Sequence, residues 1–356
     1  MKTEELKTGQ DRGEMLNHLK KNFTETEKII YSRRSVRWYK KEQVPEFMVK
    51  RILEAGRFAP SAGNCQPWKF LVIREPEIID GLTKSIIRIT RLFKSVLEYR
   101  LRGSFWKLPI AKLYIKLMPN KLHPVPFSAV TFIADEKLGL FHGAPTVILI
   151  LKDVRGVSNP DLDIGIAGQN MVLAANSMGL GTCWVSFVTT VFDYTRKWHR
   201  RLGIKYPWKV CTSLAIGWSV GNPNGMVTRP THAIDWFENG KKTVLDPGGP
   251  ASIGFFEKRK VPHYSKPSQT QWGDLVFNHA ICNKCGYCVR ICPASALVQD
   301  DDKLPKKNLE DPLYGCMSCG DCVAICPKGA ITLKSDYNFT KRFKTLEHGG
   351  LKPPRL

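Results

Sequence analysis

Apolar and polar residues alternate along the first 220 positions with two different periods, which predict helices and strands in turn. Residues 46–55 form an amphipathic stretch that is entered through Pro45 and ends at Gly56, as expected of a short helix. The runs at 69–73 and 145–151 are compact, apolar and rich in β-branched side chains, so strands are favoured there. The region therefore combines both kinds of element.

A longer helical period follows between Asp161 and Met178. Apolar residues recur there at intervals of three and four, at Ile164, Ala167, Met171, Ala174 and Met178. Glycines at 179 and 181 then act as stop signals, so the pattern predicts a buried helix. We expect this helix to lead into a strand at 182–187, and a further strand at 211–220.

The pattern breaks down between Gly221 and Trp272. Six prolines and repeated glycines interrupt every period in this connector, so we place a domain boundary within it. The predicted organisation is an N-terminal extension, a first domain, a Pro/Gly-rich linker, a second domain and a basic tail, at residues 1–24, 25–237, 238–271, 272–334 and 335–356.

Length and composition fit this division. A chain of 356 residues with 43% hydrophobic content can form a large core domain and a small second one. The first 25 residues are charged throughout and carry no apolar signal-peptide core, and no later segment holds eighteen uninterrupted apolar residues. We therefore expect a cytoplasmic protein, in which clustered cysteines stay reduced and bind metal rather than form disulfides.

The net charge of +22 is concentrated in one segment. Ten Lys or Arg residues lie between Lys84 and Lys121 against one acidic residue, Glu98, and apolar side chains at helical spacing are interleaved with them. Such a stretch can be a lid packed on its own domain, or it can dock peripherally on the anionic inner face of a membrane. Nucleic acid is not an expected partner, because no recognition fold or base-stacking module is visible.

Eight of the eleven cysteines lie in two matched runs near the end of the sequence. Both runs read CxxCxxCxxxCP, with cysteines at Cys282, Cys285, Cys288 and Cys292 and again at Cys316, Cys319, Cys322 and Cys326. Zinc ribbons use separate CxxC pairs, whereas this continuous run is typical of two-cluster bacterial ferredoxins. A structural zinc domain is the alternative.

The resemblance to ferredoxins covers residues 275–333 and implies a small ferredoxin-like domain with two [4Fe–4S] clusters. In this pattern the fourth cysteine of each run binds the other cluster, so Cys292 belongs with the second run and Cys326 with the first. Prolines after both residues fix the turn, and Gly286 and Gly320 let backbone N–H groups approach the sulfurs. Such a domain transfers single electrons.

A second redox cofactor is expected upstream, as the partner of these clusters. No GxGxxG opens a helix after a strand, which argues against a Rossmann domain. The segment SRRSVR instead gathers three guanidiniums and a hydroxyl, at Arg33, Arg34, Ser35 and Arg37, and this combination suits a phosphate. After the predicted helix, APSAGNCQPW offers backbone and amide donors that can lie along a flat heterocycle.

These two segments resemble the nitroreductase family of flavoproteins, over residues 25–237. The resemblance implies an α+β fold with a mixed sheet flanked by helices, an obligate homodimer, and FMN held in a groove at the dimer interface. It places the FMN phosphate and ribityl chain on Arg33, Arg34, Ser35 and Arg37, with Arg229 as a second phosphate ligand. The other FMN-binding residues that it implies are Pro60, Ser61, Ala62, Asn64, Val185, Ser186 and Gly217.

The functional hypothesis joins the two domains. Electrons from a low-potential donor, such as a ferredoxin-like protein, pass through the clusters to FMN and on to a small electron-poor acceptor: a nitroaromatic, a quinone or an activated alkene. In one alternative, an NAD(P)H-oxidising flavoprotein passes electrons out through the clusters. In another, the chain is an electron-transfer module docked on a membrane. In this family the insertion at 84–142 covers the flavin. No catalytic residue is assigned, and Tyr99 and His142 are only candidates.

Overall fold

The computed structural model describes large parts of both predicted domains. The described residues are 23–97, 105–107, 109–110, 113, 124–157, 159–221, 223, 231–249, 274–293, 295–308, 316 and 320–334. The predicted basic tail and residues 1–22 of the extension lie outside them. Within the described part of the chain, no helix is both long and apolar enough to cross a membrane.

The first domain alternates helices and strands. Its elements are α2 (Glu25–Ser32), α3 (Glu46–Arg57), the 3-10 turn η1 (Ala62–Asn64), β1 (Trp68–Ile73), α4 (Pro76–Leu97), η2 (Phe105–Lys107), α6 (Pro124–Ala134), β2 (Thr146–Asp153), α7 (Pro160–Ser177), β3 (Gly181–Trp184), α8 (Val188–Tyr194), α9 (Lys197–Arg201) and β4 (Trp208–Gly217). The helices and strands expected at 46–55, 69–73, 145–151, 161–178, 182–187 and 211–220 are all present, with small shifts at their ends.

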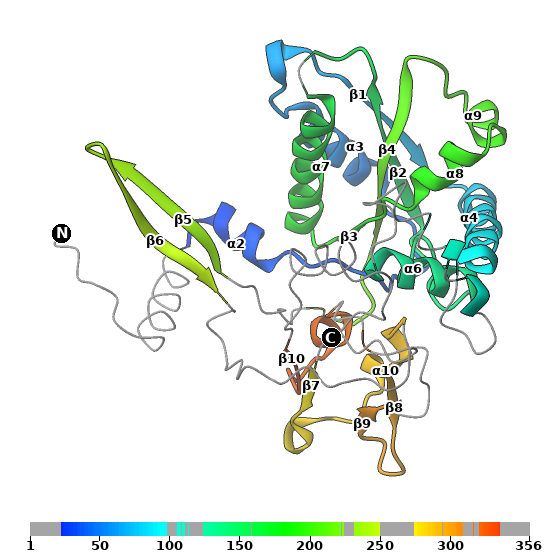
Figure 1. The fold of residues 1–356 in the computed structure, drawn as a ribbon, viewed down its shortest axis with the longest axis vertical. Coiled ribbons are helices and arrows are strands. Elements are labelled where there is room, and N and C mark those ends of the chain that lie inside the picture. The colour runs from blue at the N-terminus through cyan, green and yellow to red at the C-terminus, as the bar shows by residue number, and fades with distance from the viewer. Residues whose placement is uncertain are drawn as a thin grey trace.

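A four-stranded sheet in the order β1-β2-β4-β3 forms the centre of this domain. Its named strands pair antiparallel, and Ser35 adds a parallel bridge to Thr182 beside β3, which makes the sheet mixed. Helices α3 and α7 cover one face, whereas α4, α8 and α9 cover the other (Figure 1).

Strand β2 is buried on both sides of the sheet. Val147, Leu149 and Leu151 belong to the core beneath α4 and α8, whereas Ile148 and Ile150 belong to the core beneath α3 and α7, and none of the five is more than 1% exposed. Successive strand residues point to opposite faces of the sheet. When both faces are buried, apolar residues are needed at every position and the usual alternation with polar residues is absent. This explains the uninterrupted apolar run in the sequence.

Helix α4 carries the start of the basic amphipathic segment. It packs on α6 and α8 through a buried face that includes Ile78, Leu82 and Ile86. Two of its apolar residues lie elsewhere: Leu92 is 64% exposed and Val96 is 43% exposed. The helix therefore packs on its own domain and also presents apolar side chains to solvent.

Part of the connector between Gly221 and Trp272 is regular structure, although prolines and glycines interrupt its sequence periods. Strands β5 (Thr231–Glu238) and β6 (Lys241–Gly249) form an antiparallel hairpin there. Asn239 and Gly240 have φ angles of 52° and 70°, as a two-residue type I′ turn requires. Residues 250–271 of the predicted linker lie outside the described residues.

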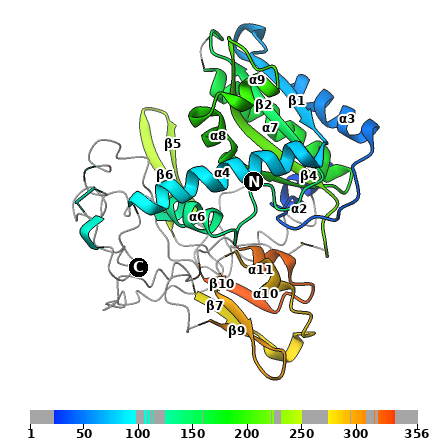
Figure 2. The ribbon, with the colours of Figure 1, turned by 90° about the vertical axis from the view of Figure 1, so that its right-hand side faces the viewer.

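The C-terminal domain is small and built around the cysteine runs. It comprises β7 (Asp274–Phe277), η3 (His279–Ile281), α10 (Tyr287–Ile291), β8 (Leu297–Gln299), β9 (Pro305–Lys307), α11 (Asp321–Ile325) and β10 (Ile331–Lys334). Strand β10 pairs with β7, and β8 pairs with β9. The helices α10 and α11 lie on the side that faces the first domain, and the short strands lie on the far side (Figure 2).

Candidate functional site

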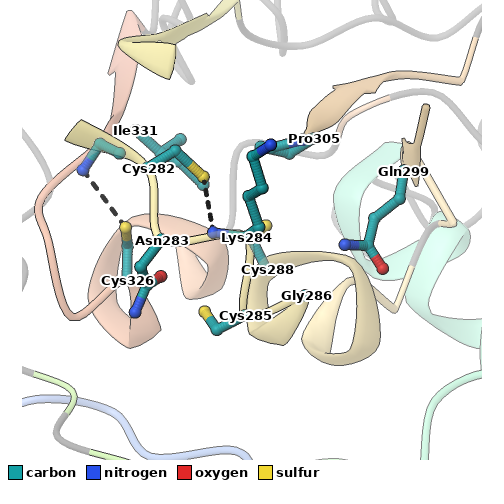
Figure 3. A pocket seen from close by; sticks show the side chains of 11 residues that line it. Cys282, Asn283, Lys284, Cys285, Gly286, Cys288, Gln299, Pro305, Cys326 and Ile331 are labelled. Atoms are coloured by element: carbon teal, nitrogen blue, oxygen red, sulfur yellow. Dashed lines mark hydrogen bonds between the residues drawn. The ribbon is translucent and has the colours of Figure 1, made fainter. Parts of the chain in front are cut away.

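Four cysteines from both runs line one pocket of the C-terminal domain. They are Cys282, Cys285, Cys288 and Cys326, the set expected for the first cluster (Figure 3). The backbone N–H of Lys284 donates to the Cys282 Sγ at 3.4 Å, and that of Ala330 donates to the Cys326 Sγ at 3.2 Å. Amide donors of this kind are what a thiolate-bound cluster needs around its sulfurs.

The remaining described cysteines of the two runs gather in a second group. Cys322 has Cys316 and Cys292 as charge neighbours, and these thiols add to the rise in its pKa that burial causes. The backbone N–H of Ala296 donates to the Cys292 Sγ at 3.3 Å. The crossed grouping of Cys292 and Cys326 that the ferredoxin resemblance implied is therefore present. The fourth predicted ligand, Cys319, lies outside the described residues.

Glycines position the helices that carry the third ligand of each run. Gly286 and Gly320 are the N-caps of α10 and α11 and have left-handed φ angles of 71° and 78°. Glycine adopts this conformation without the steric cost that a Cβ brings. Each glycine thus begins a helix whose second residue is the third cysteine of its run, Cys288 in α10 and Cys322 in α11.

The first group consists of thiols, which as thiolates are the usual ligands of iron–sulfur clusters. Among the described residues, no three His, Cys, Asp or Glu side chains converge closely enough to hold one metal ion. Burial raises the pKa of Cys288 to about 11, with further contributions from the Cys285, Cys326 and Cys282 thiols, and bound iron offsets this cost by holding the thiolate.

The arginine-rich segment runs in an extended conformation beside β3. The N–H of Val36 donates to the Thr182 carbonyl at 2.9 Å, and a Cβ at Gly181 would lie only 2.6 Å from a Val36 methyl. The charges of Arg33 and Arg37 both oppose the rise in the pKa of Cys183 that burial causes, and Cys183 packs in the same core cluster as Val36. Two of the four predicted phosphate-binding residues thus act on one buried position of β3.

The arginines of this segment already have protein partners. Arg34 donates through Nη1 to the carbonyls of Tyr31 and Arg33, at 2.6 and 2.8 Å. Arg37 donates through Nη1 to Asp321 of the C-terminal domain, in an ion pair whose acidic member is only 4% exposed. No local pattern predicts this pair, and its one sequence signal is that Asp321 is an acidic residue directly before a predicted cluster ligand.

The predicted ring-binding residues lie at the end of β3. The N–H of Val185 donates to the Ser213 carbonyl at 2.9 Å, and the Ser213 hydroxyl donates to the Val185 carbonyl at 2.8 Å. Both backbone groups of Val185 are thus engaged with β4. Ser186 shares a 3.2 Å hydrogen bond with the Thr212 hydroxyl.

Gly217 has a packing role in the same sheet. A Cβ at this position would lie 2.8 Å from the Pro145 ring and 3.0 Å from the Tyr39 ring. The second predicted phosphate ligand, Arg229, lies outside the described residues.

The remaining predicted FMN segment, 60–64, lies at the opposite end of α7. Pro67, just after it, contacts the start of α7 through Gly156 and Pro160. By contrast, Asn176 near the end of α7 donates to the Ile29 carbonyl at 3.0 Å, close to the arginine segment. Because α7 has 18 residues, its ends are roughly 27 Å apart. The two predicted FMN segments therefore do not converge within one chain.

His142 lies beside Arg37. It has a left-handed φ of 56°, and burial together with the Arg37 charge lowers its pKa to about 3. His142 is therefore neutral at ordinary pH. The other candidate, Tyr99, lies outside the described residues.

The comparisons with known proteins decide the family. The nitroreductase family model matches residues 30–218, more than half of the chain, and a 4Fe–4S dicluster domain model matches residues 281–331. The chain belongs to the nitroreductase family. Its expected fold class is confirmed, and the second match confirms the expected domain with a pair of 4Fe–4S clusters.

Two curated relatives carry the same name. A putative NADH dehydrogenase/NAD(P)H nitroreductase of Archaeoglobus fulgidus is 28% identical over 44% of this chain and 65% of its own length. One of Methanothermobacter thermautotrophicus is 27% identical over 44% of this chain and 57% of its own length. The chain therefore spans less than two thirds of these relatives. Among solved structures, an FMN-bound nitroreductase from Bacteroides fragilis matches with 22% identity and a TM-score of 0.45, over 63% of this chain and 100% of that one.

Proposed function

We propose that this chain is a flavin-dependent reductase that receives electrons through its own C-terminal domain. The observation that carries the proposal is the ion pair between Arg37, in the predicted FMN segment, and Asp321, directly before the cluster ligand Cys322. It joins the predicted flavin site to the cysteine domain. The acceptor that we propose is a small electron-poor molecule, such as a nitroaromatic, a quinone or an activated alkene.

The residues of the first domain divide the binding of FMN between them. Arg33, Ser35 and Arg37 hold the phosphate and ribityl chain, the arginines through charge-assisted hydrogen bonds. Ser186, at the end of β3, borders the ring, whereas Gly217 keeps the neighbouring strand close to Tyr39. When bound, the flavin supplies the exchange between single electrons and two-electron reduction of an organic substrate.

We further propose that the active protein is a homodimer. In one chain the segment 60–64 lies at the far end of α7 from the arginine segment, so a second copy has to supply it if both contact one FMN. The outer surfaces of α3 and α7 also expose large apolar side chains, with Phe47 63%, Phe58 71% and Leu162 58% exposed. Large apolar side chains exposed on a surface are common where subunits meet.

Anaerobic spectroscopy tests the proposal. Protein purified without oxygen should show flavin absorption on a broad iron–sulfur band near about 400 nm. Reduced ferredoxin should then bleach the clusters first and the flavin afterwards, while NADH and NADPH bleach neither. The absence of either cofactor, or a flavin that stays oxidised while the clusters are reduced, contradicts the proposed function.

A second candidate function reverses the electron flow. The relatives from Archaeoglobus fulgidus and Methanothermobacter thermautotrophicus are named as putative NADH dehydrogenases/NAD(P)H nitroreductases, which favours a nicotinamide as the donor. FMN held by the arginine segment would then accept hydride from NAD(P)H, and clusters held by the two cysteine groups would pass electrons outward to a protein acceptor. Rapid bleaching of the flavin by NADH or NADPH, before the clusters change, distinguishes this candidate from the first.

Peripheral membrane contact is a separate proposal about the basic segment. Leu92 and Val96 on α4 are exposed beside Lys and Arg residues, and Trp106 in η2 is 67% exposed. Apolar side chains flanked by positive charge can insert at an anionic lipid surface. Flotation with anionic vesicles at low salt tests this, and failure to float contradicts it.

A further inference from the structure

The seam between the two domains is formed by consecutive residues of the arginine segment. Arg37 pairs with Asp321, and the ring of Trp38 meets that of Tyr287 edge to face with centroids 5.7 Å apart. A third contact joins Gly221, after β4, to Ile325, which a Cβ on the glycine would approach to 3.2 Å. The C-terminal domain thus rests on residues 37, 38 and 221 of the first.

Asp321 and Tyr287 occupy the same position in the internal repeat. Each stands between the capping glycine and the third cysteine of its run, at the first residue of α11 or α10. The two halves of the repeat therefore use equivalent positions to contact neighbouring residues of one extended segment. The side chains at these equivalent positions differ, because Asp321 is an acid and Tyr287 carries an aromatic ring.

The two contacts differ in what they join. Asp321 pairs with Arg37, one of the residues proposed to bind FMN, whereas Tyr287 meets Trp38, which is not one of them. The pKa of Cys183 on β3 is raised by burial and is also affected by the charges of Arg37 and Asp321, so the ion pair lies beside the strand that leads to Val185 and Ser186. The α11 half of the repeat therefore contacts the proposed flavin site.

The cysteines of the second group also contact the first domain directly. Phe132 of α6 is only 3% exposed and forms a small apolar cluster with Ala296, against which Leu138, Cys292 and Cys316 pack. The pocket of the first group is different. Every residue that lines it, from Cys282 to Ile331, belongs to the C-terminal domain (Figure 3).

We propose that the ion pair between Arg37 and Asp321 fixes the order of the two clusters. It seats α11 against the proposed flavin site, so that the cluster bound by Cys292, Cys316 and Cys322 is the inner one, adjacent to the flavin. The cluster of Cys282, Cys285, Cys288 and Cys326 is the outer one and exchanges electrons with a protein partner. Each transfer moves one electron from the inner cluster to the flavin, and two transfers complete its reduction. The inference rests on the proposed function for this last step.

Matched ligand variants test the order. Cys282→Ser and Cys316→Ser remove the first ligand of each run and leave one intact cluster, which the iron content of each variant verifies. Single electrons are injected anaerobically by flash photoreduction with a soluble one-electron donor, and the cluster and flavin bands are followed. We expect Cys282→Ser to keep the transfer from cluster to flavin and Cys316→Ser to lose it. The opposite pattern, or equal loss in both, overturns the order.

The ion pair is tested by Asp321→Asn, with Asp302→Asn in the exposed turn after β8 as the control for charge. Asp321→Asn should slow the transfer by about tenfold or more, because truncation of a buried charge pair leaves its partner unpaired. Hydrogen–deuterium exchange supplies a readout that does not depend on activity: backbone amides of α10 and α11 should exchange faster in Asp321→Asn only.

The two kinds of failure are distinguishable. If the unaltered protein shows no transfer from clusters to flavin, the proposed function fails, and the exchange result still judges the docking. If Asp321→Asn leaves both the transfer rate and the exchange unchanged, the ion pair does not hold the domains together, and the inference fails while the proposed function stands. If either cysteine variant does not retain its remaining cluster, the comparison of Asp321→Asn with the unaltered protein, in transfer rate and in hydrogen exchange, tests the inference instead.

Discussion

At the scale of single residues, close contacts rather than conformational freedom explain why some glycines are needed. Gly168, in the middle of α7, lies against the Trp184 ring, and a Cβ there would meet the ring's Cη2 at 2.1 Å. The helix can approach β3 closely only because this side chain is absent. Glycine lowers the stability of a helix when it lies inside one, and at this position the close packing of α7 on β3 offsets that cost.

Gly168→Ala should destabilise the first domain by about 1–3 kcal/mol, because the added methyl forces the Trp184 ring out of its place. Urea unfolding followed by circular dichroism measures the change. The control is the same substitution with Trp184→Phe, which removes the ring atoms that the methyl meets. Gly168→Ala should cost less in that background. An equal cost in both backgrounds contradicts the contact.

His142 should make the folded state sensitive to mild acid. Its pKa is about 3 when folded, because of burial and of Arg37, and the ordinary value of 6.5 applies when unfolded. Between these values the unfolded state binds the proton and the folded state does not, so stability falls as pH decreases below 6.5. Above 6.5 both states are neutral, and the effect is absent.

The measurement compares urea unfolding at pH 7.5 and pH 5 for the unaltered protein and for His142→Gln. The unaltered protein should lose up to about 1.4 kcal/mol per pH unit below 6.5 from this residue, and the variant should lack that contribution. The same slope in both proteins means that His142 is protonated in the folded state.

At the scale of elements, the hydrophobic pattern predicted where helices and strands lie but not which faces they bury. Helix α4 shows this, because Leu92 and Val96 share the helical spacing of its apolar residues and are nevertheless exposed. A periodic pattern identifies a face, whereas burial depends on the neighbours α6 and α8 that pack against it. The hairpin β5–β6 was not predicted, because nearby prolines interrupt the periods of its strands. Its clearest sequence signal is the turn at Asn239 and Gly240.

If α4 docks on lipid, Leu92→Gln combined with Val96→Gln should weaken binding to anionic vesicles, because two apolar side chains no longer insert. Flotation at low salt measures the effect. Ile89→Gln, on the half-buried side of the same helix, is the control. We expect the control to lower stability and leave vesicle binding of the folded protein unchanged. If the unaltered protein, the double variant and the control all float equally, Leu92 and Val96 have no role in vesicle binding.

At the scale of the whole molecule, spacing alone predicted both clusters, because ligation depends on short-range geometry. Seven of the eight predicted ligands lie among the described residues, in the two expected groups. The contact between Arg37 and Asp321 joins residues 284 positions apart, and no local pattern encodes such a pair. Sequence proximity also suggested that the segments at 33–37 and 60–64 act together, whereas α7 separates them in one chain.

A shared site between two copies can be tested by complementation. Arg33→Ala and Asn64→Ala should each abolish FMN binding, because each removes one half of the proposed site. When differently tagged versions are unfolded, mixed and refolded, a mixed dimer carries one unaltered site and one doubly altered site. We expect about half of the flavin content of the unaltered dimer, measured by absorbance. If mixed dimers form without regaining flavin, both segments act within one chain.

The most direct test of the central claim is a rapid-mixing experiment on the anaerobic holoprotein with reduced ferredoxin. The account predicts that the broad cluster absorption bleaches first and recovers as the flavin band bleaches, at a rate independent of protein concentration because the transfer occurs within one molecule. Reduction of the flavin without prior reduction of the clusters, or clusters that stay reduced beside an oxidised flavin, contradicts the account.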